Sequence, residues 1–116
     1  MTERRLAAFM FTDIVGHAGL IAKSEEQGLR VLERIVQLVR ARVAEHGGVL
    51  AEVEDDETFS TFPTALGAVS CAVALQEDLR GESILVVRIG IHQGDLGTAG
   101  PRSAAARVGS GRGCTV

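Results

Sequence analysis

The segment V-L-A-E-V-E-D-D-E-T-F-S-T-F, residues 49 to 62, decides the fold, because two strand-like runs flank a turn made of acids. Val49 to Val53 and Thr58 to Phe62 are rich in residue types that favour strands. Glu54 to Glu57 separate the two runs, and aspartate tolerates the unusual backbone angles of a turn. The segment therefore predicts a β-hairpin.

A helical pattern precedes this hairpin. Apolar residues recur at helical spacing, with one apolar face, from Glu25 to His46. They are Leu29, Leu32, Ile35, Val36, Val39 and Val43. Ser24, with Gln27 three residues later, has the capping-box pattern of a helix start. Gly47-Gly48 is expected to end the helix through a left-handed C-cap.

A second helix and two outer strands complete the pattern. Pro63 and Thr64 open the helix, and its expected apolar positions include Leu66, Val69, Ala72, Val73 and Leu75. Leu6 to Thr12 is an almost continuous apolar run, as expected of a strand buried on both faces. Ile84 to Ile91 is a β-rich strand that Q-G-D closes. The order β-α-β-β-α-β favours an α/β (α+β) sandwich of ferredoxin-like type, with both helices on one face of one sheet.

Composition limits the function classes. The 116 residues fit one small domain, and an apolar fraction of 46% is too high for disorder. The net charge of -3 disfavours nucleic acid as a partner, and stacking residues are scarce because four phenylalanines are the only aromatics. No apolar run reaches membrane-spanning length, so we expect a cytoplasmic protein without membrane insertion. Cys71 is expected to be a small buried hydrophobic residue, and His17 a surface residue.

Two acids come together in this fold. Asp13 closes the first strand and Asp56 lies in the hairpin turn. Because the first strand lies beside the third, both carboxylates can reach the same edge of the sheet, where a hard divalent cation such as Mg²⁺ would offset their repulsion. Gly16 and Gly19 let the backbone after Asp13 approach an anion. The alternative interpretation is a solvated acidic hairpin tip.

Four motifs in order resemble the class III adenylate and guanylate cyclase catalytic domain. F-T-D-I-V-G, residues 11 to 16, resembles its first metal-binding motif, and E-H-G-G, 45 to 48, the end of its first long helix. F-P-T-A-L-G-A-V-S-C-A-V-A-L-Q, 62 to 76, and R-I-G-I-H-Q-G-D, 88 to 95, follow the hairpin as in the family. The resemblance spans residues 4–96 and defines a partial cyclase-like domain.

The resemblance implies a reaction and a site. Such domains convert ATP or GTP into a 3′,5′-cyclic nucleotide and pyrophosphate by two-metal catalysis, in cyclic-nucleotide signalling. Two Mg²⁺ or Mn²⁺ ions would be held by Asp13, Asp56 and the backbone of Ile14, while Val15 and Gly16 would contact the nucleotide. The active site forms between two domains, so a homodimer is implied.

The hairpin departs from the family pattern K-x-I-G-D-G-F. Asp56 keeps its place, but Asp55 and Glu57 replace the two flanking glycines. Glu52 occupies the base-reading position, where glutamate is the guanylate-type choice because a carboxylate accepts from the N–H groups of guanine. The alternative for Glu52 is a strand residue that faces solvent.

The last twenty residues, 97–116, are low in complexity and expected to be poorly ordered. The family continues beyond its R-I-G-I-H strand with a helix that bears an asparagine and a catalytic arginine. Only S-A-A-A-R, 103 to 107, is faintly similar, so Arg107 would be that arginine; alternatively the tail is unrelated and the family's C-terminal part is lacking. Two functions therefore stay open: a nucleotide cyclase, or an inactive cyclase-like domain that binds metal–nucleotide or dimerises.

Overall fold

The computed structural model describes residues 6–82, 86–95 and 113–115. One antiparallel sheet contains five strands in the order β2-β3-β1-β4-β5. The elements in chain order are β1 (Leu6–Ile14), α1 (His17–Lys23), α2 (Glu25–Glu45), β2 (Val49–Glu54), β3 (Glu57–Phe62), α3 (Ala65–Leu79), β4 (Val87–Asp95) and β5 (Gly113–Thr115). The first four strands of the sheet and the two long helices have the predicted ferredoxin-like arrangement.

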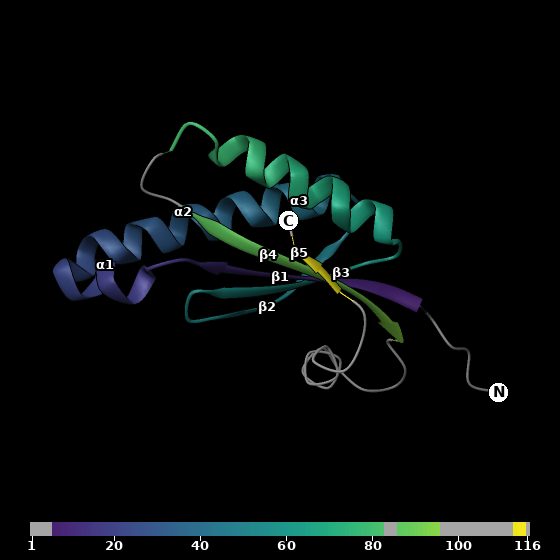
Figure 1. Cartoon of the computed structure of the whole chain (residues 1–116), viewed down its shortest axis with the longest axis horizontal. Helices are drawn as coiled ribbons and strands as arrows, with labels where there is room; N and C mark the ends of the chain where they lie inside the picture. Colours follow the sequence, from purple (N-terminus) through teal and green to yellow (C-terminus); the bar gives the residue numbers. More distant parts are fainter. Residues whose placement is uncertain (1–5, 83–85, 96–112, 116) are drawn as a thin grey trace.

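Both long helices cover the same face of the sheet, as predicted (Figure 1). Successive residues of β1 point to opposite faces, so Ala8 and Met10 pack under the helices while Phe9 packs on the other face. The helix-side core includes Ile35, Val39, Val43, Phe62, Cys71, Leu75 and Ile89. On the opposite face Phe9 stacks on Phe59, with their ring centroids 5.6 Å apart. The prediction that the first strand is buried on both faces is confirmed.

The predicted helix boundaries have the expected caps. The side chain of Ser24 accepts a hydrogen bond from the backbone N–H of Gln27 at 3.2 Å, and Thr64 accepts one from Gly67 at 3.1 Å. Gly47 has a φ of 76°, the left-handed conformation that ends α2. These local signals fix where the two long helices begin and where α2 ends.

The apolar positions predicted for α3 are confirmed only in part, because Ala72 and Leu75 are buried but the other three are not. Leu66 is 76% exposed, and Val69 and Val73 are exposed as well. The face that packs on the sheet is Ala68, Cys71, Ala72, Leu75 and Leu79. Cys71 is buried as expected, and this burial raises the pKa of its thiol to about 11.

Helix α1 is fixed against the start of α2, and this corrects the prediction for His17. His17 is buried, and its Nε2 lies 3.0 Å from the carbonyl oxygen of Gly28. Only glycine allows this close crossing, because a Cβ on Gly28 would lie 2.5 Å from Cγ1 of Ile21. The contact holds the segment that follows Asp13 in place.

An ion pair joins the two long helices. Arg42 of α2 donates from Nε and Nη2 to the carboxylate of Asp78 on α3, at 2.6 and 2.7 Å. The guanidinium lowers the pKa of Asp78 below its usual value. Both side chains are about one-quarter to one-third exposed, so this two-pronged pair is a close, partly shielded contact between the helices.

Strand β4 ends later than predicted. β4 continues through Q-G-D to Asp95, where the sequence predicts an end after Ile91, and residues 83–85 at its predicted start lie outside the described residues. Residues 96–112, with Arg107, also lie outside them. Gly113–Thr115 pairs with β4. No helix in the described part of the chain is long and apolar enough to cross a membrane.

Candidate functional site

Asp13 lies near the end of the central strand. The β1 ladders place it directly opposite Glu57 of β3 and Arg88 of β4. By alternation with the buried Thr12, its side chain belongs to the sheet face opposite the helices. The topology therefore brings a carboxylate, a second carboxylate and a guanidinium to one place, from three strands that are distant in sequence.

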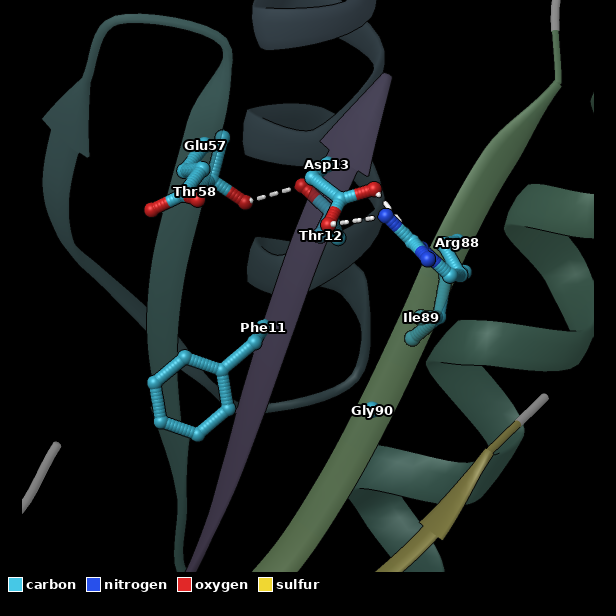
Figure 2. A pocket seen from close by; sticks show the side chains of 8 residues that line it. All are labelled: Phe11, Thr12, Asp13, Glu57, Thr58, Arg88, Ile89 and Gly90. Atoms are coloured by element: carbon cyan, nitrogen blue, oxygen red, sulfur yellow. Dashed lines mark hydrogen bonds and ion pairs between the residues drawn. The ribbon is translucent and has the colours of Figure 1, made fainter. Parts of the chain in front are cut away.

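A cavity of about 330 Å³ opens at this place. Figure 2 shows its lining, which comes from β1, β3 and β4. The lining residues are Phe11, Thr12, Asp13, Glu57, Thr58, Arg88, Ile89 and Gly90. Within this lining, the hydroxyl oxygens of Thr12 and Thr58 lie 2.5 Å apart in a buried hydrogen bond that joins β1 to β3. The cavity is thus built on paired strands rather than on loops, which suits a preorganised site.

Arg88 already contacts both oxygens of Asp13. Its Nε donates to Oδ1 at 3.2 Å and its Nη2 to Oδ2 at 3.3 Å (Figure 2). Sequence reasoning did not identify Arg88 as a site residue. Arg88 could have been identified only from the register of β1 and β4, which places it opposite Asp13.

The hairpin turn is tighter than predicted. β2 runs to Glu54 and β3 starts at Glu57, so the turn consists of Asp55 and Asp56 alone. Glu57, not Asp56, is therefore the cross-strand neighbour of Asp13, and Asp56 is the residue before it. Asp56 lies at the same end of the sheet as Asp13, as the sequence predicts, and so does Glu57, which the sequence did not single out.

Glu52 lies next to this cavity. It pairs with Phe59 across the hairpin, and with Phe11 and Glu57 it lines a smaller hollow of about 90 Å³. The two hollows share Phe11, Glu57 and Thr58. Glu52 is partly buried and makes an interaction of its own.

The segment after Asp13 borders a separate hollow of about 310 Å³. Gly16 has a φ of 77°, which turns the chain from β1 into α1. Val15 donates its backbone N–H to the carbonyl of Val86 at 2.9 Å, so this group is not free for a phosphate while that bond lasts. Lys23 also lines the hollow and supplies a cation that the sequence did not single out.

The sequence and the structure of this chain were compared with those of known proteins. No family model matches the chain. Putative adenylate cyclase 3 of Rhizobium meliloti (strain 1021) is 32% identical over 102 residues, which cover 81% of this chain and 17% of that protein. The crystal structure of the guanylyl cyclase Cya2 is 27% identical, with a TM-score of 0.69. That of an adenylate/guanylate cyclase/hydrolase from Silicibacter pomeroyi is 28% identical, with a TM-score of 0.71.

The chain belongs to the class III adenylate/guanylate cyclase family. It covers only part of each relative: the matches span 81% of this chain and 56% of the Cya2 chain, and 82% and 60% for the Silicibacter protein. The predicted ferredoxin-like fold of cyclase type is confirmed.

The altered turn of this cyclase domain carries a backbone strain that can be tested. Asp55 has a φ of 52°, and no other non-glycine residue in the described part of the chain has a positive φ. We expect Asp55→Gly to raise the free energy of unfolding by about 0.5–1 kcal/mol, because glycine adopts this conformation without steric cost. Asp55→Ala should lower it by about 1 kcal/mol.

Urea denaturation would measure both changes, and Asp55→Asn is the matched control. Asparagine keeps the shape and the tolerance for positive φ but removes one charge from the acidic turn. If Asp55→Asn stabilises as much as Asp55→Gly, charge repulsion rather than backbone strain is the cause.

Proposed function

We propose that this chain carries the metal-binding part of a nucleotide cyclase that forms a 3′,5′-cyclic nucleotide and pyrophosphate from ATP or GTP. The observation that supports it is the position of Asp13 at the end of the central strand, inside a cavity and beside the turn that bears Asp56. Both acids occupy the positions that match the family's metal-binding aspartates.

The proposed metal ligands are oxygen donors, which hard divalent cations prefer. Among residues 6–82, 86–95 and 113–115, no group of three or more His, Cys, Asp or Glu side chains could hold a metal. Mg²⁺ needs less than that, since it is usually bound by one or two carboxylates together with substrate phosphates and waters. Asp13, Asp56 and the carbonyl of Ile14 would hold Mg²⁺ or Mn²⁺, which when bound lowers the pKa of the 3′-hydroxyl and offsets charge on the triphosphate.

The chain's own residues would bind and orient the nucleotide. In the reaction the 3′-oxygen bonds to the α-phosphorus as its proton leaves, and the bond from that phosphorus to the bridging oxygen breaks to release pyrophosphate. Gly16 and Lys23 border the hollow after Asp13 and can contact the phosphates. Phe11 offers an apolar ring surface beside Glu52, whose carboxylate accepts hydrogen bonds as guanine requires. Two such chains would form the site as a homodimer, as the family resemblance implies.

An assay of the purified chain tests this function. We expect cyclic nucleotide to accumulate with Mn²⁺ and either ATP or GTP, and none to form when EDTA removes the metal. More cyclic GMP than cyclic AMP is the expected preference if Glu52 reads the base.

The test is made at chain concentrations where sedimentation shows a dimer. If neither product forms there, the proposal that the chain is a nucleotide cyclase is contradicted. The second function, an inactive domain that binds metal–nucleotide, would then rest on Mn²⁺-dependent binding of the nucleotide. Calorimetry with a non-hydrolysable triphosphate would measure that binding.

A further inference from the structure

Asp13 has a partner, Arg88, that already contacts the carboxylate oxygens through which Asp13 would bind a cation. Arg88 donates to Oδ1 and to Oδ2 of the carboxylate, so both oxygens accept a hydrogen bond from one guanidinium (Figure 2). On the other side of Asp13, the β1–β3 ladder places Glu57 opposite it. Like charges directly opposite each other on a sheet repel, and Arg88 offsets that repulsion.

The Arg88–Asp13 pair is loose by the standard of this same molecule. Its two hydrogen bonds measure 3.2 and 3.3 Å, whereas those between Arg42 and Asp78 measure 2.6 and 2.7 Å. The Arg88 side chain is 67% exposed, against 32% for that of Arg42. An exposed pair with long contacts contributes little stability, so a competing ligand of Asp13 can open it.

We infer that Arg88 is a built-in counterion that holds the Asp13 carboxylate until a divalent cation displaces it. Arg88 acts through Asp13 and is therefore a positioning residue. The inference rests on the proposed metal site. Arg88 lowers the affinity of Asp13 for the cation, because a bound cation must first replace the guanidinium and then lie near its positive charge.

Arg88→Gln tests the inference without any reaction. We expect its Mn²⁺ affinity to rise about tenfold over that of the unchanged chain. Mn²⁺ alone is titrated, and paramagnetic broadening of the amide signals around Asp13 reports binding at this site. Arg88→Lys, which keeps the charge but loses the two-pronged contact, should fall between the two.

Two further variants make the result specific. Arg30→Gln removes the same charge from an exposed arginine on α2 that pairs with Glu26, and its Mn²⁺ affinity should stay within about twofold of the unchanged chain. Asp13→Asn should abolish the local broadening. Thermal unfolding confirms that each variant is folded, and Arg88→Lys serves if Arg88→Gln is not.

Each outcome distinguishes the two proposals. Tighter binding in Arg88→Gln but not in Arg30→Gln supports the counterion. Binding that is equal or weaker in Arg88→Gln overturns the counterion and leaves the metal site standing. Broadening that is missing in both the unchanged chain and Arg88→Gln overturns the metal site and the counterion together.

Discussion

Replacement of Asp13 by asparagine is expected to lower the rate of cyclic-nucleotide formation by at least about a thousandfold. Asparagine keeps the shape of the side chain but offers a neutral oxygen, which is a poor ligand for Mg²⁺ or Mn²⁺. The fold should change little, because the pair with Arg88 is exposed and contributes at most about 1 kcal/mol. Initial rates at saturating Mn²⁺ and a thermal unfolding curve measure the two effects.

Glu26→Gln is the matched control for this change. Glu26 also pairs with an arginine, Arg30, and both of these side chains are about three-quarters exposed on α2. The substitution removes the same charge from α2, which packs on the sheet face opposite to that of Asp13 (Figure 1), so the rate should stay within about twofold. A residual rate above about a tenth in Asp13→Asn would contradict its role as a metal ligand.

The second ligand can be assigned by the same assay. The sequence motif points to Asp56, whereas the strand register places Glu57 opposite Asp13. We expect Asp56→Asn to be as severe as Asp13→Asn and Glu57→Gln to cost less than about tenfold. The reverse order would transfer the ligand role to Glu57 and identify the turn as the part of the family motif that has changed.

The order of strands and helices could be predicted because its signals are local. Ser24 and Thr64 cap the two helices through bonds that span three residues, and Gly47 ends α2 by its own φ. The buried face of α3 could not be predicted in the same way. Leu66, Val69 and Val73 keep helical spacing, yet the face that packs on the sheet is that of Ala68, Cys71, Ala72, Leu75 and Leu79. In a helix that is apolar almost all round, periodicity does not say which side faces the core.

The site could be predicted in part for a related reason. Asp13 and the hairpin meet because topology puts the first strand beside the third, which the element order alone implies. The contact between Asp13 and Arg88 depends on the register of two strands that are 75 residues apart. The alternation of Val87, Ile89 and Ile91 fixes the face on which Arg88 lies. A slip of two residues would keep that face but move Arg88 away from Asp13, and apolar alternation alone does not exclude such a slip. The residue opposite Asp13 also depends on the length of the hairpin turn. A turn of Asp55 and Asp56 alone places Glu57 at this position.

Phe62→Ala is expected to lower the free energy of unfolding by about 3–5 kcal/mol. The side chain is 1% exposed in the core between sheet and helices. Its ring also packs on the backbone where β2 begins, since a Cβ on Gly48 would lie 2.5 Å from Cε1 of Phe62. Loss of the ring therefore leaves a cavity that close-packed neighbours cannot fill. For a domain of this size the change is a large share of the total stability, which is about 5–15 kcal/mol.

Urea denaturation of three variants tests where the core lies. Phe62→Leu keeps most of the apolar volume and should cost less than about 2 kcal/mol. Leu66→Ala is the sharper control, because Leu66 is one of the apolar positions expected of the helix from the sequence but is 76% exposed on α3. Its replacement should change the free energy of unfolding by no more than about 0.5 kcal/mol. A cost of about 2–5 kcal/mol, which is typical of a buried leucine, would instead place Leu66 in the core and contradict its exposure on α3.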